Sequence, residues 1–276
     1  MMTAAHEKLE KVRLRLLDLE SVLIAYSGGV DSTFLLKVAH DTLNSKAVAL
    51  TAISPTYPPE EIEEAKRLCN KIGIKQILAD SNEMNEPNFA SNPPDRCYYC
   101  KTELFDICVE KAKEEGLSYI LDGTNADDEI DYRPGRKAAK EHSILSPLKE
   151  AGFTKQEIRE LSREMGIDTW DKPSFACLSS RFPYGTEITD GRLRIIGDAE
   201  RFLKTLGFRI FRVRYHDKIA RLELGEEDFR KILDLSTKRA IADKFKSLGF
   251  TYVTLDIEGY RQGSMNEALN QKKAGG

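Results

Sequence analysis

The chain has 276 residues, a hydrophobic fraction of 41% and a formal net charge of −3, which indicates a globular protein of about two domains. This charge gives no overall basic field and argues against a nucleic-acid-binding protein, although a local basic patch stays possible. No apolar run is as long as a membrane span, and residues 1–15 predict a charged amphipathic helix and not a signal peptide, so we expect a cytoplasmic protein.

The first part of the sequence alternates helices and strands, as in α/β proteins whose parallel sheet is covered on both faces. Helices are expected over residues 3–19, from Asp31, from Pro59, over 96–115 and, after the capping box of Thr154 and Glu157, up to Met165. The expected strands are short apolar runs at 22–26, 46–53, 74–79, 119–122 and 143–148.

The sequence changes character after a long irregular segment, residues 170–189, whose length favours a functional role. A helix over 190–206, a hairpin of strands 209–215 and 219–224, a helix within 226–248 and a strand over 252–257 follow. These elements predict a smaller α+β domain, so we expect domains at 1–187 and 188–276. Residues 272–276 are expected to fray.

The first strand leads into Ser27-Gly28-Gly29-Val30-Asp31-Ser32, which we call the phosphate loop. Its two glycines lack a Cβ, so backbone N–H groups can surround an anion at the N-terminus of the following helix. The patterns GxxxxGK[ST] and GxGxxG do not occur here, and a plain strand–helix turn is the alternative. Polar residues 122–128 follow the fourth strand, and 131–135 continue this ligand-binding edge.

Three of the five cysteines are candidates for chemistry. Cys97 and Cys100 share one face near a helix N-terminus, where they suit a redox pair, half of a zinc site or two ligands of an iron–sulfur cluster. Cys177 lies in the long irregular segment. Cys69 and Cys108 instead follow helical core stripes. The four histidines lack ligand spacing, so the three thiols favour a cluster with one open iron over a closed zinc site.

Two arginines, Arg212 and Arg214, alternate on a predicted strand and therefore share a face. Such spacing alone is typical of a solvated face. Paired guanidinium groups would also bind a phosphate, and Ser180 with Arg181 adds a hydroxyl and a further guanidinium group.

The hexapeptide of the phosphate loop resembles the signature of the PP-loop ATP pyrophosphatases, which split ATP between its α- and β-phosphates. Further segments extend the resemblance to the LarE family over nearly the whole chain. They are residues 96–101, 122–123, 131–135, 177–185, 212–214, 219–224 and 249–256. The resemblance implies a Rossmann-like fold of the adenine nucleotide alpha hydrolase type with a smaller C-terminal α+β domain for substrate binding and oligomerisation.

LarE proteins are ATP-dependent sulfur transferases of nickel-pincer nucleotide biosynthesis. The resemblance implies that each carboxylate of pyridinium-3,5-dicarboxylic acid mononucleotide is adenylated, with release of pyrophosphate and then AMP, and becomes a thiocarboxylate. Some members sacrifice one cysteine, whereas others hold a 4Fe–4S cluster on three. Because Cys97 and Cys100 are present, the chain resembles the cluster-dependent type. A sacrificial Cys177 is the alternative.

The resemblance also assigns residues. The ATP-binding set is Ala25, Ser27, Gly28, Gly29, Asp31, Ser32, Ile53 and Gly123, assisted by Lys101 and Mg²⁺. The catalytic set is Cys177, Asp31 and Lys101. Substrate phosphate would bind Ser180, Arg181, Arg212 and Arg214. Glu200 and Glu223 match acidic positions near a divalent metal. A sulfide or sulfur donor, other nickel-pincer biosynthesis proteins and a homo-oligomer are the expected partners.

Other functions stay open at this stage. A PP-loop tRNA thiolase also combines this loop with three cysteines, but it would need a basic RNA-binding surface. An amidotransferase-type synthetase would need a glutaminase domain or free ammonia. A nucleotide-binding sensor would bind ATP without releasing pyrophosphate, and this release separates it from an enzyme.

Overall fold

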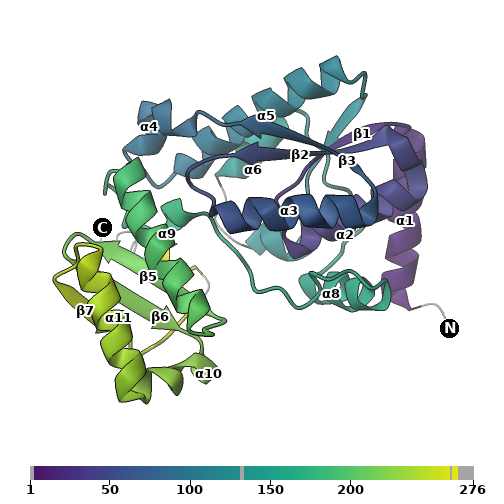
Figure 1. The fold of residues 1–276 in the computed structure, drawn as a ribbon. Coiled ribbons are helices and arrows are strands. Elements are labelled where there is room, and N and C mark those ends of the chain that lie inside the picture. The colour runs from purple at the N-terminus through teal and green to yellow at the C-terminus, as the bar shows by residue number, and fades with distance from the viewer. Residues whose placement is uncertain (1–2, 131–133, 262, 267–276) are drawn as a thin grey trace. The chain divides into compact units, whose positions relative to one another are not determined.

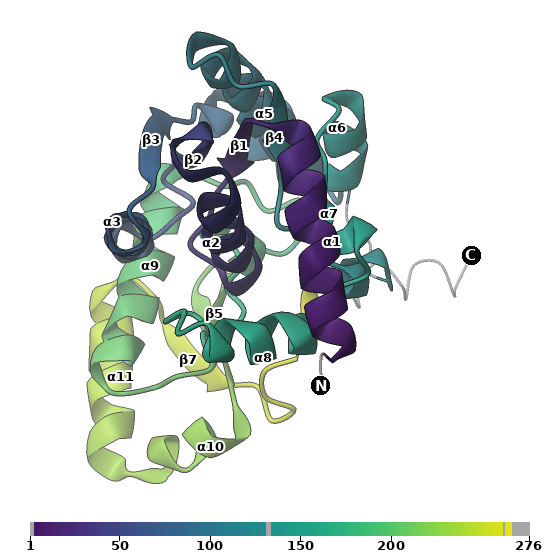
Figure 2. The ribbon, with the colours of Figure 1, turned by 90° about the vertical axis from the view of Figure 1, so that its right-hand side faces the viewer.

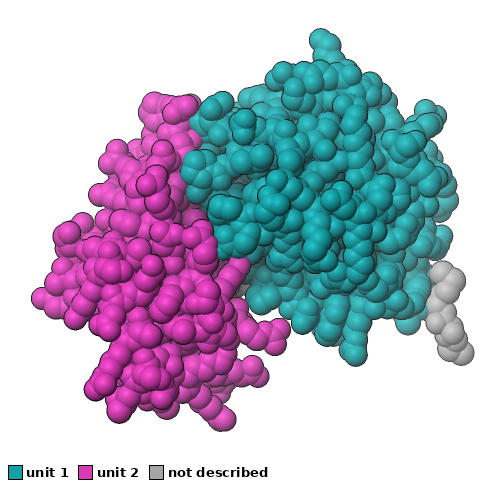
Figure 3. Space-filling model, in the orientation of Figure 1, with its two compact units in different colours: residues 1–83, 95–175 teal, residues 84–94, 176–276 magenta. Residues whose placement is uncertain are grey.

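A computed structural model describes residues 3–130, 134–261 and 263–266 (Figure 1). The chain forms two compact units, coloured separately in Figure 3. Unit 1 contains residues 1–83 and 95–175, and unit 2 contains 84–94 and 176–276. The expected features at 131–133 and 272–276 lie outside the described residues.

Unit 1 is built on a parallel sheet that has four strands within the described residues, in the order β3-β2-β1-β4. The strands are β1 (Val22–Ala25), β2 (Ala47–Ile53), β3 (Lys75–Asp80) and β4 (Tyr119–Leu121). Val22, Leu23 and Ile24 have no solvent exposure, since helices cover β1 on both faces. This double burial explains the unbroken apolar run in the sequence.

Two layers of helices cover the sheet, as Figure 2 shows. The helices are α1 (Ala4–Leu19), α2 (Val30–Leu43), α3 (Pro59–Ile72), α5 (Arg96–Glu114), α6 (Gly135–Glu141), α7 (Pro147–Glu150) and α8 (Lys155–Glu164). Helices α1, α2, α3 and α8 pack with Val22 and Ile24, whereas α5 and α6 pack with Leu23. The α/β fold predicted from the sequence is confirmed.

The prediction of a fifth strand at 143–148 is wrong. Only an isolated bridge joins Leu145 to Leu121 among the described residues of this segment. Ser143 has a positive φ of 54°, and Pro147, which lacks an N–H group, begins α7. Both features prevent the segment from extending as a strand.

Unit 2 contains a small mixed sheet with helices, which agrees with the α+β character expected from the sequence. Its elements are α4 (Pro87–Ala90), α9 (Asp190–Thr205), β5 (Phe211–His216), β6 (Ile219–Leu224), α10 (Glu226–Phe229), α11 (Leu235–Ser247) and β7 (Tyr252–Leu255). Strands β5 and β6 form the predicted antiparallel hairpin, and β7 runs parallel to β6. The helix expected within 226–248 is interrupted, because Asp234 caps α11 through Thr237 N.

The units divide at 175/176, whereas the sequence led us to expect a boundary at 187/188. Asn92 explains the difference. Its buried side chain donates to the carbonyl oxygens of Phe182 (3.3 Å), Pro183 (2.8 Å) and Thr186 (3.1 Å). These bonds tie residues 84–94 and the end of the long irregular segment into one unit.

Within the described residues, no helix combines the length and apolar character needed to span a membrane.

Candidate functional site

The phosphate loop connects β1 to α2, and its geometry suits an anion. Gly28 has a φ of +71°, a conformation that L side chains rarely adopt, and a Cβ there would lie 3.3 Å from Ala65 Cβ. Gly29 is the N-cap of α2, and its carbonyl accepts from Thr33 N at 3.0 Å. The first N–H groups of α2 therefore lie next to the loop, where an anion can accept their hydrogen bonds.

Gly123 lies two residues after the end of β4, and its backbone lies close to Ser32 at the start of α2. A Cβ at this position would lie 2.8 Å from Ser32 N and 3.0 Å from Ser32 Cα. The preceding residue, Asp122, is held by Ser146 Oγ (2.7 Å) and by Thr124 N (3.1 Å). Because backbone meets backbone here, only glycine fits between β4 and the phosphate loop without a shift.

Asp31 is the second residue of α2, and its two carboxylate oxygens have different surroundings. Oδ2 accepts a hydrogen bond from Lys155 Nζ. Oδ1 is buried and has no hydrogen-bond partner within the described part of the chain. A carboxylate oxygen of this kind, beside a phosphate cradle, fits a divalent cation such as Mg²⁺.

Lys172 is a second lysine beside the phosphate loop. Its Nζ donates to Gly28 O at 3.2 Å and pairs with Glu61 (2.9 Å) and Glu64 (3.0 Å) of α3. Sequence reasoning missed both Lys155 and Lys172. Their contacts in the loop are 124 and 144 residues away in the chain, so no local spacing could reveal them.

The other residues predicted for ATP lie on neighbouring elements of unit 1. Ala25 and Ile53 end β1 and β2, so both lie at the carboxyl edge of the sheet. Lys101 lies in α5 with its Nζ over the Phe105 ring, 5.3 Å from the centroid, and a Cβ on Gly135 would lie 2.8 Å from Lys101 Cγ. The parts of these residues in ATP binding stay predictions.

The cysteines divide into buried and accessible thiols. Cys69 and Cys108 are 1% and 0% exposed, and burial raises the pKa of each thiol to about 12, which confirms their core positions. Cys97 is exposed and Cys100 half-buried in the first turn of α5. Cys177 is half-buried in unit 2. Among the described residues, no three His, Cys, Asp or Glu side chains are grouped to hold a metal ion.

Cys177 is the second residue of a tight turn, residues 176–181, which we call the Cys177 turn. The Cys177 carbonyl oxygen accepts from Ser180 N (3.0 Å), Ser180 Oγ (2.9 Å) and Arg181 Nη1 (3.0 Å). The same Arg181 Nη1 also donates to Ala176 O at 2.6 Å. One guanidinium group thus holds the backbone on both sides of the Cα atom that carries the thiol.

Arg181 is 0% exposed and forms a two-point ion pair with Glu200 of α9, at 2.9 and 2.8 Å. Glu200 Oε1 also accepts from Val213 N at 3.0 Å. Burial alone would raise the pKa of Glu200, but the charge of Arg181 and these hydrogen bonds hold it below its ordinary value. The predicted phosphate-binding Arg181 and the predicted metal-binding Glu200 are therefore partners of each other.

Arg214 and Glu223 form a second buried ion pair at 2.7 Å, on neighbouring strands β5 and β6. Arg214 Nη1 donates to Ser180 O at 2.8 Å, which links this pair to the Cys177 turn. Arg212 is half-buried over the Tyr260 ring, and burial lowers its pKa to about 10. The structure thus brings together the predicted set of unit 2, and neither arginine is a simple solvated charge.

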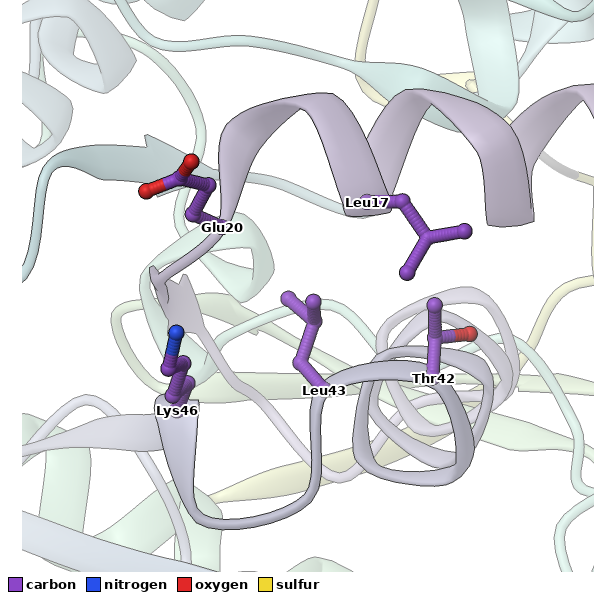
Figure 4. A pocket seen from close by; sticks show the side chains of 5 residues that line it. All are labelled: Leu17, Glu20, Thr42, Leu43 and Lys46. Atoms are coloured by element: carbon purple, nitrogen blue, oxygen red, sulfur yellow. The ribbon is translucent and has the colours of Figure 1, made fainter.

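A hollow of about 340 Å³ lies elsewhere in unit 1 (Figure 4). Its lining consists of Leu17, Glu20, Thr42, Leu43 and Lys46. Helix α2 begins at the phosphate loop and ends at Leu43, so the hollow is about 20 Å from the loop, at the other end of the helix. None of the predicted site residues lines it.

Comparisons with known proteins give one matching family and several similar proteins. The NAD synthase family matches residues 4–92. The chain is 38% identical, over 98% of both chains, to the pyridinium-3,5-bisthiocarboxylic acid mononucleotide synthase of Lactiplantibacillus plantarum. It is 47% identical to an uncharacterized protein of Synechocystis sp., over 96% of this chain and 98% of that one. A tRNA-specific 2-thiouridylase of Rickettsia typhi is 27% identical over 55% of this chain and 53% of its own.

Proposed function

Because this chain belongs to the LarE family of pyridinium-3,5-bisthiocarboxylic acid mononucleotide synthases, we propose that it uses ATP to insert sulfur into pyridinium-3,5-dicarboxylic acid mononucleotide. The observation that carries the proposal is the 38% identity along 98% of both chains. The phosphate loop supports it independently, since its geometry suits the phosphates of a nucleotide.

The first step is the adenylation of a substrate carboxylate. A carboxylate is a poor electrophile because its leaving group would be oxide, whereas an acyl-adenylate loses AMP. The N–H groups at the start of α2, with Ser27 and Ser32, hold the phosphates while the substrate oxygen attacks the α-phosphorus and pyrophosphate leaves. Asp31, whose Oδ1 is buried without a hydrogen-bond partner among the described residues, would hold Mg²⁺, and Lys101 would add a positive charge.

The second unit supplies the substrate site. A mononucleotide carries a phosphate, and guanidinium groups bind phosphate with paired hydrogen bonds. Arg212, Arg214 and Ser180 take this part, while Arg181 is paired with Glu200. Glu223, which pairs with Arg214, fixes the position of that guanidinium group.

Cys97, Cys100 and Cys177 would hold the 4Fe–4S cluster. Thiolates are the ligands of such clusters, and these three thiols are accessible at least in part, in contrast to Cys69 and Cys108. When bound, the cluster would supply an iron with a free coordination position for sulfide. The thiocarboxylate forms as sulfide sulfur bonds to the acyl carbon and the carbon–oxygen bond to AMP breaks. The bonds that the Cys177 carbonyl accepts hold this cysteine in place.

The test supplies the full chain, anaerobically, with ATP, Mg²⁺, sulfide and the dicarboxylate mononucleotide. We expect thiocarboxylated product, AMP and pyrophosphate, more than one product per subunit, and an unchanged protein mass. We expect Asp31→Ala to lose pyrophosphate release, because the substitution removes the carboxylate that would bind the metal ion. If the protein lost the mass of H₂S during the reaction and Cys97→Ala remained active, the cluster model would be wrong. Cys177 would then be a sacrificial sulfur donor.

The same assay contains the controls for the other functions. Unmodified tRNA in place of the mononucleotide should give no pyrophosphate. Pyrophosphate release with tRNA alone would identify a tRNA thiolase and overturn the proposal. ATP binding without pyrophosphate release, with either acceptor, would identify a sensor.

A further inference from the structure

Lys155 contacts the Asp31 carboxylate, and no motif in the sequence assigns it a role. Its Nζ donates to Asp31 Oδ2. The other oxygen, Oδ1, remains buried and makes no hydrogen bond to any described residue. The ammonium group therefore distinguishes the two oxygens: one is bound, and the other is left for a cation.

Three contacts fix the start of helix α8, where Lys155 is the first residue. Thr154 caps the helix through a capping box with Glu157. The Lys155 backbone N–H donates to Asp127 Oδ2 at 2.8 Å, in the segment that follows β4. Lys8 of α1 holds Glu157 at 2.7 Å and the Gly152 carbonyl oxygen at 2.8 Å. These contacts fix the position of the backbone that carries the Lys155 side chain.

The ion pair between Lys155 and Asp31 has two consequences for nucleotide binding. A carboxylate in a phosphate cradle repels the phosphates of ATP unless cations share it. A second partner that binds one oxygen of a metal-binding carboxylate also fixes its orientation, and the loss of such partners commonly weakens metal binding by about ten- to a hundredfold. Lys155 meets both requirements at Asp31.

We propose that Lys155 is a positioning residue of the ATP site: it holds Asp31 Oδ2 so that Oδ1 faces the metal ion of the nucleotide. This inference rests on the proposed use of ATP by the phosphate loop. It assigns to Lys155 a role through Asp31 and not a direct contact with the phosphates.

The probe for the test is Mn²⁺ with α,β-methylene-ATP, which cannot be split between its α- and β-phosphates. Binding to the full chain is measured by titration calorimetry. We expect Lys155→Met to raise the dissociation constant of the complex about ten- to a hundredfold. Lys155→Arg keeps a donor within reach of Oδ2 and should recover most of this loss.

Lys37→Met is the matched control. Lys37 forms an ion pair with Asp41, farther along α2, and the exposures of its pair (29% and 34%) resemble those of the Lys155–Asp31 pair (30% and 21%). Neither residue of this pair belongs to the phosphate loop or to α8. We expect this variant to bind the probe like the wild-type chain, and an equal loss in both variants would overturn the proposal.

A double variant tests whether Lys155 acts through Asp31. If it does, Asp31→Asn combined with Lys155→Met binds the probe within about twofold of Asp31→Asn alone. Additive losses would mean that Lys155 contacts the nucleotide directly, and wild-type binding by Lys155→Met would mean that it has no role. Either result overturns the inference but leaves the proposed function, whereas a wild-type chain that binds no probe overturns both.

Discussion

The phosphate loop of unit 1 and the Cys177 turn of unit 2 are both short turns, but different forces hold them. In the phosphate loop, glycines, a helix N-cap and backbone contacts set the geometry, and Gly123 lies against Ser32 N. The Cys177 turn is held by Arg181, a fully buried cation whose partner Glu200 is 19 residues away. The first depends on the shape of the backbone, and the second on a buried pair of charges.

This difference predicts which substitutions each region tolerates. An added Cβ should damage the phosphate loop, where backbone atoms are in contact. A change of charge should damage the Cys177 turn, because a buried ion without its partner is costly. The experiments below test this contrast.

The largest effect is expected from Arg181→Met. This substitution leaves the Glu200 carboxylate buried without its cation, and breaking a buried pair in this way costs about 3–5 kcal/mol. Denaturant unfolding measures the loss. The double variant Arg181→Met with Glu200→Met removes both charges and should regain most of the stability. A double variant as unstable as the single one would show that the charges are not the cause.

The same pair predicts how stability depends on pH. The pKa of Glu200 is lower in the folded chain than its ordinary value, so its contribution is fully present above the ordinary pKa of glutamate, about 4.3. That contribution is lost as the pH falls below this value through the lowered pKa. The double variant should lose less stability over this acidic range than the wild-type chain.

Alkylation of cysteines separates stability from positioning. The double variant lacks the Arg181 hydrogen bonds to Ala176 O and Cys177 O, so the turn should loosen even where the fold is stable. We expect iodoacetamide to modify Cys177 faster in the double variant than in the wild-type chain. Cys97, which lies in unit 1, serves as the internal control in the same mass spectrum.

The contrast also explains what could be predicted from the sequence. The strands of the parallel sheet, the phosphate loop and the Thr154 capping box each follow from residues that are close in the sequence. Local patterns were therefore sufficient to predict them. The Arg181–Glu200 pair and the Lys155–Asp31 contact join distant parts of the chain, and nothing in the local sequence indicates either partner. The strand expected at 143–148 failed for a related reason: its apolar run outweighed Pro147, which ends the extended segment.

A smaller effect is expected from Gly123→Ala. The new Cβ would lie 2.8 Å from Ser32 N, so the backbone must shift, at a cost of about 1–3 kcal/mol. Because the shift occurs at the phosphate loop, binding of α,β-methylene-ATP should weaken with it. Gly191→Ala in α9 is the control, since no atom lies within 4 Å of its added Cβ. That variant should be as stable as the wild-type chain or slightly more stable. Unchanged nucleotide binding in Gly123→Ala would contradict the tight contact.

The smallest effect is expected from the helix caps, one in each unit. Thr154 caps α8 and Thr189 caps α9, each through a hydrogen bond of 3.3 Å from a backbone N–H group. Replacing either threonine by alanine should cost about 1 kcal/mol, which thermal unfolding can measure. The two variants should differ in nucleotide binding, because α8 carries Lys155 and α9 carries no residue assigned to ATP. We expect Thr154→Ala to weaken binding of α,β-methylene-ATP slightly and Thr189→Ala to leave it unchanged. Equal nucleotide binding in both would show that the position of Lys155 does not depend on the cap of its helix.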